Sequence, residues 1–209
     1  MTDDRLDVAR RHAPVLYHEF DPECGRQDVP GPFDFDGNRV ANDNWDDFPL
    51  HAIEPTVYYT VLETETHLFI AYHVFHPRDW APITLYVQDT HENDGENLQV
   101  VVEKSTGEVV MLFTQAHFCG GVYVNDRDQI ESADVEIRGP FTLEGTHPAV
   151  YVESQGHGIY GEIDPFEHGL ILRAGDEARE PEPPYSGEAT YVLESLPAKI
   201  GPHLLESIG

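Results

Sequence analysis

Residues 90–103, THENDGENLQVVVE, place imidazole and carboxylate groups at the start of an apolar stretch. Side chains alternate between the two faces of an extended strand, so Asp94 and Glu96 share one face. That face also carries Leu98, Val100 and Val102. These apolar residues direct the face to the core, where an uncompensated carboxylate costs several kcal/mol or shifts its pKa. A bound cation is one way to compensate Asp94 and Glu96.

A loop is the alternative for the first part of this segment. If the strand begins after Glu96, then Asp94 and Glu96 are solvated and Gly95 is a turn residue. The segment by itself is compatible with both conformations, so the choice depends on residues elsewhere in the chain.

Two further segments place polar groups beside predicted strands. FHPRDW, residues 75–80, ends a strand and contains His76 and Asp79. HPAVYVESQGHGIYG, residues 147–161, contains His157 between two glycines, where the backbone can approach a ligand closely. We expect His157 to support a cation ligand or to contact a bound molecule, with His76 and His117 as further candidates. A purely structural histidine in a glycine-rich turn is the alternative.

The acidic segment resembles a known cation-binding signature. THENDGENLQVVV aligns without gaps on the Gly-His-Arg-His-Asp-Trp-Glu signature of the necrosis- and ethylene-inducing-like (NLP) proteins. The resemblance implies that His91, Asp94 and Glu96 hold a divalent cation. FHPRDW resembles the aromatic-Phe-Pro-Lys-Asp segment of the same family, which implies that Asp79 is the remaining carboxylate ligand. Residues 147–161 are similar to a pattern in the related Vps62-like proteins.

Several residues depart from the NLP signature. Its glycine, arginine, second histidine and tryptophan are replaced by Thr90, Glu92, Asn93 and Gly95. The resemblance therefore implies the family's β-sandwich fold and its cation site, but we do not carry over its toxicity to plant cells. One imidazole with three carboxylates suits Mg²⁺, Ca²⁺ or Mn²⁺, and Zn²⁺ with histidine and carboxylate ligands also remains open.

The leading functional expectation is cation-dependent recognition of a polar ligand such as a glycan or a lipid head group. A metal-assisted hydrolase is an alternative from the enzyme class. A glycosidase is another, since Glu92, Asp94 and Glu96 resemble the E-x-D-x-E active-site strand of β-sandwich glucanases. There, Glu92 would be the nucleophile and Glu96 the general acid/base, with carboxyl groups about 5 to 5.5 Å apart. A cation that only stabilises the fold is the third possibility.

A second acidic region, FDFDGNRVANDNWDDF, spans residues 33–48. Asp34, Asp36 and Asn38 resemble the beginning of a calcium-binding loop. The closing glutamate expected at the twelfth position is absent, because Trp45 occupies that place. Asx-turns in a long surface loop explain the same composition.

Charge and cysteine content restrict the partners and metal clusters that this chain could have. The chain has 12 Lys and Arg against 39 Asp and Glu, a formal net charge of -27, which disfavours nucleic acid and anionic membrane surfaces as partners. Cys24 and Cys119 cannot form a zinc cluster by themselves, and their pairing stays open. No signal peptide and no apolar run of about 18 residues is found, so we expect a soluble, cytoplasmic protein without a membrane span. The oligomeric state is not predicted.

The remaining pattern predicts an all-β protein: a single-domain antiparallel β-sandwich over residues 1–209, with long loops and little helix. Within it we expect an N-terminal segment with the acidic loop (1–55), core strands with the cation site (56–173) and an exposed proline-rich loop (177–188). Predicted strands cover 56–63, 67–75, 97–103, 108–118, 148–154, 169–173 and 189–195. Short helices are expected at 3–11 and after Pro197.

Overall fold

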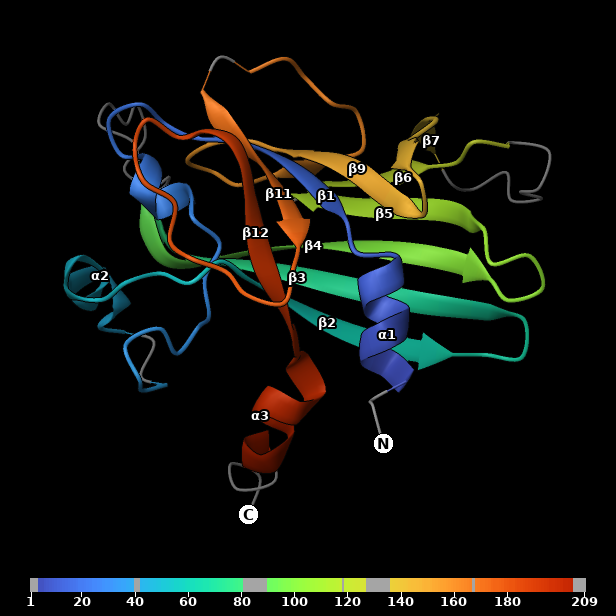
Figure 1. Cartoon of the computed structure of the whole chain (residues 1–209), viewed down its shortest axis with the longest axis horizontal. Coiled ribbons are helices and arrows are strands. Elements are labelled where there is room, and N and C mark those ends of the chain that lie inside the picture. Colours follow the sequence, from blue (N-terminus) through green and yellow to red (C-terminus); the bar gives the residue numbers. More distant parts are fainter. Residues whose placement is uncertain are drawn as a thin grey trace.

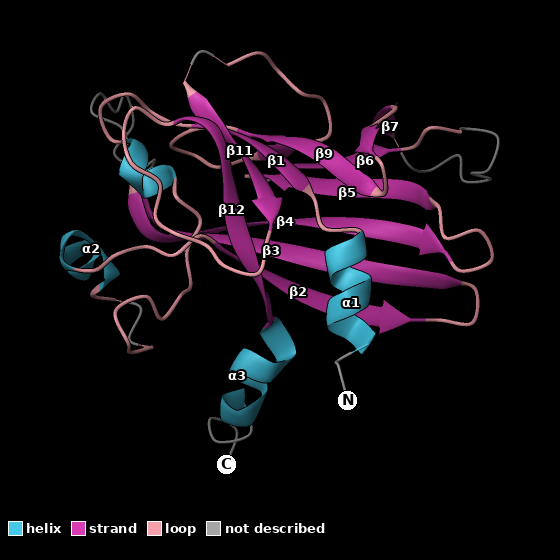
Figure 2. Cartoon of the chain, viewed as in Figure 1, coloured by secondary structure: helices cyan, strands magenta, loops and turns pink. Residues whose placement is uncertain are grey.

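The structure is a computed structural model that describes residues 4–39, 42–80, 90–117, 119–126, 136–166 and 168–204. It is mainly β, with little helix, as the sequence predicts (Figures 1 and 2). The strands are β1 (Val15–Glu19), β2 (Thr56–Glu63), β3 (His67–Asp79), β4 (His91–Glu103), β5 (Val109–Ala116), β6 (Cys119–Tyr123), β7 (Ile137–Gly139), β8 (Thr142–Glu144), β9 (His147–Val152), β10 (Ile159–Tyr160), β11 (Gly169–Ala174) and β12 (Ser186–Ser195).

The helices are short and lie outside the sheet. They are α1 (Asp4–Arg11), the 3-10 helix η1 (Gly25–Asp28), α2 (Asn44–Asp47), the 3-10 helix η2 (Phe48–Leu50) and α3 (Leu196–Leu204). Acidic residues in the first turn of α1 and arginines in its last turn complement the helix dipole. The carbonyl of buried Ala9 accepts a hydrogen bond from the Tyr72 hydroxyl at 2.7 Å, which fixes α1 against β3. None of the described helices combines the length and the apolar composition that crossing a membrane requires.

The strands form one mixed sheet, which differs from the predicted antiparallel sandwich. Its twelve strands follow the order β10-β9-β1-β11-β12-β2-β3-β4-β5-β6-β7, with β8 paired to β9. The pairs β1–β9, β11–β12, β12–β2 and β6–β7 are parallel. A parallel pair needs a crossover connection, and residues 175–185 provide one between β11 and β12. Because β12 pairs with β2, two groups of strands join into one continuous sheet instead of two separate ones.

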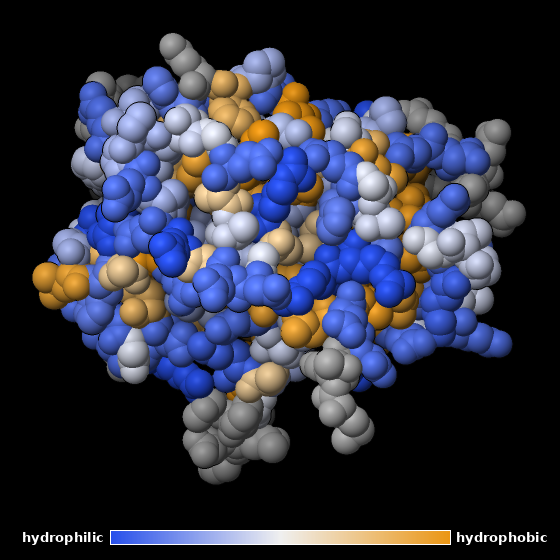
Figure 3. All heavy atoms as spheres, viewed as in Figure 1, coloured by the Kyte–Doolittle hydropathy of each residue, from blue (hydrophilic) through white to orange (hydrophobic). Residues whose placement is uncertain are grey.

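The sheet curls so that its two halves enclose a common core. β10 pairs with β9 at one end of the strand order and also lies against β5 from the other half. Fully buried apolar residues come from both halves, including Leu16, Tyr72, Leu98, Val150, Leu172 and Tyr191. Outside the core, hydrophilic residues cover most of the face shown in Figure 3, with apolar patches between them.

β3 and β4 form the longest strand pair and carry the segment singled out in the sequence. Each has 13 residues, and Val74 pairs with Glu96, Tyr72 with Leu98 and Ile70 with Val100. The alternation expected for β4 is present, since Glu96 and the apolar residues at every second position after it are buried. The strand begins at His91, so Asp94 and Glu96 lie within it and not in a loop. The predicted turn at 104–107 follows β4, with Gly107 at a φ of +75°.

The expected exposed loop at 177–188 is only partly a loop. β12 begins at Ser186, inside that range, because Ser186 pairs with Gly169 as β11 begins. Glu180 is also fixed by two hydrogen bonds. Its Oε1 accepts one from Arg26 Nε at 2.5 Å, and its Oε2 accepts one from the Ile53 backbone N–H at 2.9 Å. The proline-rich composition therefore predicted an irregular segment but not its attachment to the body of the protein.

Candidate cation site

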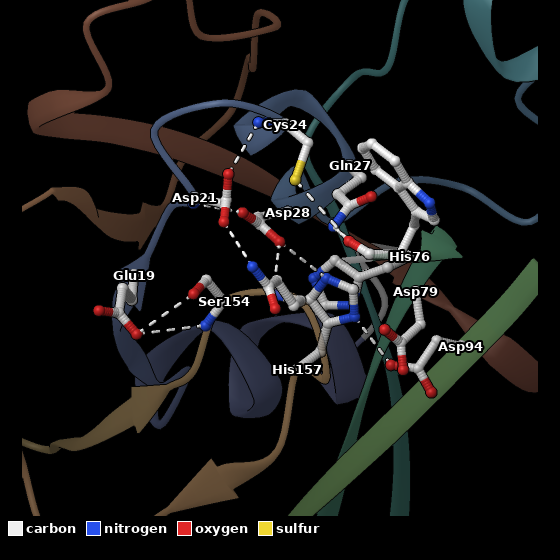
Figure 4. Close-up of polar contacts among 12 residues, drawn as sticks. Glu19, Asp21, Cys24, Gln27, Asp28, His76, Asp79, Asp94, Ser154 and His157 are labelled. Atoms are coloured by element: carbon white, nitrogen blue, oxygen red, sulfur yellow. Dashed lines mark hydrogen bonds and ion pairs between the residues drawn. The ribbon is translucent and has the colours of Figure 1, made fainter. Parts of the chain in front are cut away.

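The candidate site lies where β3 ends and β4 begins. In this register His76 pairs with Asp94 and Asp79 pairs with His91, so the predicted residues are cross-strand neighbours. η1 and the loop of residues 153–158 approach the same place and bring Asp28 and His157 (Figure 4). Two segments distant in sequence, η1 and the loop of residues 153–158, therefore meet at the end of this strand pair.

His157 bridges two carboxylates at the centre of this cluster. Its Nδ1 lies 2.8 Å from Asp94 Oδ2 and its Nε2 lies 3.1 Å from Asp28 Oδ1, with the ring fully buried. Carboxylates accept hydrogen bonds, so both ring nitrogens donate and His157 is an imidazolium. Burial lowers the pKa of His157, but the hydrogen bonds and charges of Asp28 and Asp94 outweigh it and raise the pKa to about 9. His157 is thus a cation built into the site.

Asp28 is a site residue that the sequence pattern did not reveal. It is fully buried and accepts backbone N–H bonds from Asp21 at 2.7 Å and from Gln155 at 2.9 Å. These bonds join the segment before η1 to the loop that carries His157. No local motif marks Asp28, and its contact with His157 spans 129 positions of sequence.

Two further histidines pack beside His157. The His76 ring is stacked on the His157 ring, with centroids 3.6 Å apart and planes 10° apart. His76 Nε2 lies 3.1 Å from His18 Nε2, and His18 Nδ1 lies 2.8 Å from the Glu19 carbonyl oxygen. Burial lowers the pKa of His76 well below its ordinary value and that of His18 to about 3, so both rings are neutral. His18 was not expected from the sequence; it is a buried polar residue between Tyr17 and Glu19 in β1.

Glu96 contributes a carboxylate with one free oxygen. Its Oε1 accepts the His117 backbone N–H at 2.8 Å, whereas its buried Oε2 has no hydrogen-bond partner among the described residues. The side chain is only 4% exposed, and burial raises its pKa to about 7. A buried carboxylate oxygen without a partner is suited to bind a cation or to accept a hydrogen bond from a ligand.

Asp79 and His91 occupy the outer edge of the site. Burial raises the pKa of Asp79 to about 6, the His157 charge opposes this, and Asp94 adds to it. His91 Nε2 lies 3.6 Å from Asp79 Oδ2, too far for a hydrogen bond, and the His91 side chain is 49% exposed. The structure therefore places Asp79, His91 and Asp94 where β3 ends and β4 begins, with His91 facing solvent, and Glu96 further along β4 opposite Val74.

Part of the donor set is grouped closely enough for a divalent cation. His76, Asp94 and His157 each have a ligand atom, and these atoms lie within 4.8 Å of one another. Both nitrogens of His157 already bond carboxylates, which leaves Asp94, Asp79 and the free oxygen of Glu96 as the available anionic donors. Carboxylate oxygens of this kind suit Mg²⁺, Ca²⁺ or Mn²⁺.

Glu92 faces away from this set. Its Oε2 accepts the Trp45 backbone N–H of α2 at 2.7 Å. Arg78, the strand partner of Glu92, stacks over the Trp45 ring at 4.3 Å. Asn93, between Glu92 and Asp94, has a φ of 63°, which interrupts the alternation of an extended strand. Glu92 thus attaches α2 to the sheet, and its side chain does not share a face with that of Asp94.

The remaining predicted residues lie at separate places. His117 is half exposed, with Nε2 2.6 Å from Glu153 Oε1, at the rim beside Glu96. In the acidic loop, Asp36 groups with Asp43 and Asp47, whose ligand atoms lie within 4.8 Å of one another. Asp34 instead pairs with Lys199 at 3.0 Å, and the Asn38 N–H donates to Asp36 at 3.0 Å, as in an Asx-turn. Cys24 and Cys119 are both free.

Similarity to known proteins is found at the level of solved structures. No protein-family model and no curated protein matches the sequence. A solved structure described as a toxin fold for microbial attack and plant defense has a TM-score of 0.48 at 15% identity, covering 89% of this chain and 74% of that one. NLPPya in complex with mannosamine has a TM-score of 0.47 at 18% identity, over 78% of this chain and 69% of that one.

A third solved structure belongs to the same group. Necrosis and Ethylene inducing Protein 2, from the causal agent of cocoa's Witches Broom disease, has a TM-score of 0.45 at 12% identity, over 77% of this chain and 69% of that one. This chain is similar in structure to the necrosis- and ethylene-inducing proteins. The similarity is distant, and it is the one that the acidic motif predicted.

Proposed function

We propose that this chain binds a divalent cation through Asp79, Asp94 and Glu96, with His91 at the rim. The cation in turn binds a polar ligand, a glycan or a lipid head group. The observation that carries the proposal is the buried Glu96 Oε2, which has no partner among the described residues and lies on the same strand as Asp94. Asp28 and Asp94 bond the His157 imidazolium, and its charge also acts on Asp79 and Glu96, so four carboxyl groups share one buried cationic side chain.

The exposure of the site supports a role in ligand binding. Asp94 and Asp79 each have side chains 13% exposed, and His91 and His117 are about half exposed. A cation held at this depth keeps coordination positions open toward solvent, where water or the hydroxyl groups of a ligand complete its shell. Bound in this way, a cation orients a polyol without any covalent step.

The glycosidase alternative has less support from these contacts. Glu92, its nucleophile, bonds the backbone of α2, and this role accounts for the residue without catalysis. A metal-assisted hydrolase remains the alternative from the enzyme class, because a cation with open positions also polarises a substrate oxygen.

Calorimetric titration of chelator-treated protein with Mn²⁺, Mg²⁺ and Ca²⁺ tests the cation site. We expect one ion per chain in the wild type and at least about a tenfold loss of affinity in Asp94→Asn. Glu103→Gln is the matched control, since it removes a carboxylate from the other end of β4 and leaves this site intact. Equal affinity in the wild type and in Asp94→Asn contradicts the site.

Ligand binding is tested second, on the cation-loaded protein. Glucosamine and mannosamine, the sugars in two of the NLPPya complexes, are the first probes. We expect any sugar that binds to do so only with the cation present. Binding that is unchanged by chelator separates the ligand from the cation and rejects this part of the proposal.

A further inference from the structure

The His76 ring is oriented by a chain of hydrogen bonds that starts at a backbone carbonyl. The Glu19 carbonyl oxygen can only accept, so His18 Nδ1, 2.8 Å away, carries a hydrogen. A second buried positive charge close to the His157 imidazolium is unfavourable, so His18 is neutral and its Nε2 has a lone pair. His76 Nε2, 3.1 Å from this lone pair, must then be the donor.

This assignment leaves the lone pair of His76 on Nδ1. The ring is fully buried, and Nδ1 has no hydrogen-bond partner within the part of the chain that the structure describes. Buried ring nitrogens are normally satisfied, so an unpartnered acceptor indicates a missing partner.

The position of the His76 ring indicates which groups surround the missing partner of Nδ1. His76 is the direct strand partner of Asp94, and ligand atoms of His76, Asp94 and His157 lie within 4.8 Å of one another. Both nitrogens of His157 donate to carboxylates, so of these two histidines it is His76 that keeps a ring nitrogen free. A ligating histidine usually donates its other N–H to a fixed acceptor, and His18 is such an acceptor for His76.

We propose that His76 Nδ1 is a further ligand of the cation, so that the site prefers a borderline transition-metal ion such as Co²⁺, Ni²⁺ or Zn²⁺. This inference rests on the cation site proposed above and specifies which ions it selects. Imidazole nitrogen suits these ions, whereas Mg²⁺ and Ca²⁺ prefer sites made of oxygen ligands alone. The sequence predicts one imidazole, His91, in the site, and His76 adds a second, buried one, which shifts the donor set toward the transition metals.

The first test compares affinities for Co²⁺, Zn²⁺, Mg²⁺ and Ca²⁺ in chelator-treated protein. We expect Co²⁺ and Zn²⁺ to bind at least about tenfold more tightly than Mg²⁺, and His76→Phe to reduce this preference by about tenfold. Phenylalanine keeps the ring stacked on His157 but lacks the nitrogen. His73→Phe is the matched control, because His73 lies on the same strand with its side chain on the opposite face. His76→Gln replaces His76→Phe if the latter does not fold.

The second test detects the imidazole ligand directly, by EPR spectroscopy. Cu²⁺ bound to the His91→Ala protein should show imidazole nitrogen coupling in its pulsed EPR spectrum, since removing His91 excludes the other predicted imidazole ligand. The role of His76 is overturned if this coupling is absent although Cu²⁺ binds and its binding is lost when Asp94→Asn is added. The cation site itself would still stand in that case. Failure of every divalent ion to bind the wild type overturns the cation site itself.

Discussion

His157 Nδ1 and Asp94 Oδ2 lie 2.8 Å apart at the start of β4, with the His157 ring fully buried between Asp94 and Asp28. This contact connects the loop after β9 to the predicted cation ligands. It also places a positive charge beside them at neutral pH, because both ring nitrogens donate to carboxylates. The orientation of Asp94 therefore depends on a residue that lies far away in sequence.

Replacing His157 should destabilise the protein strongly. His157→Asn leaves two carboxylates without their cation, and breaking a buried ion pair costs roughly 3–5 kcal/mol. Asparagine tolerates the φ of 54° at this position, so backbone strain adds little to the result. Urea unfolding measures the change in the free energy of unfolding, with His73→Asn as the control. A loss below about 1 kcal/mol would mean that the bridge is not an ion pair.

The stability contributed by His157 should depend on pH with a defined sign. The folded-state pKa is raised from 6.5 to about 9, so the contribution is complete below about pH 6.5 and is lost as the pH rises through about 9. We expect the difference in unfolding free energy between the wild type and His157→Asn to shrink across this interval. Urea unfolding at several pH values checks this, and a difference that stays constant argues for a neutral ring.

Glu96→Gln should stabilise the cation-free protein while weakening cation binding. Burial raises the pKa of Glu96 from 4.5 to about 7, so the ionised group costs stability as the pH rises through this interval. The amide removes this cost, on the order of 2 kcal/mol, and its oxygen still accepts the His117 N–H. Thermal melting in chelator and in Mn²⁺ measures both effects. Glu103→Gln, at the other end of β4, is the control and should change neither.

Cation affinity should increase with pH. The pKa values of Asp79 and Glu96 are raised to about 6 and about 7, and both groups must lose their protons to bind an ion. We expect affinity to rise between about pH 5 and about pH 8 and to level off above. Calorimetry in buffers of different ionisation enthalpy detects the released protons. Binding without proton release at about pH 6 would show that these two carboxylates are not ligands.

Glu92→Gln separates the binding function from the glycosidase alternative. The glutamine oxygen can still accept the Trp45 N–H, so the attachment of α2 and the cation affinity should not change. We expect no turnover of β-glucans by the wild type. If the wild type does hydrolyse a glucan and Glu92→Gln abolishes this with the cation retained, then the glycosidase assignment is correct.

Much of the candidate cation site could be predicted from short-range order in the sequence. The alternation of β4 places Asp94 and Glu96 on the buried face with Leu98, because successive side chains of a strand point in opposite directions. Asp79 and His91 end up as cross-strand neighbours because they lie on consecutive strands that pair antiparallel. Strand composition in the same way predicted a mainly β protein with little helix.

Only the tertiary structure decided what surrounds these ligands and how the sheet is connected. The bridge from Asp28 through His157 spans 129 positions, and the contact between His18 and His76 spans 58. The parallel pairing of β12 with β2, which makes one curled sheet, joins Thr56 to Val192. Such contacts depend on which strands become neighbours, and that choice results from the burial of one common core. The choice of neighbouring strands therefore cannot be predicted from adjacent residues. The alternation within β4 can be predicted, because it depends only on the strand itself.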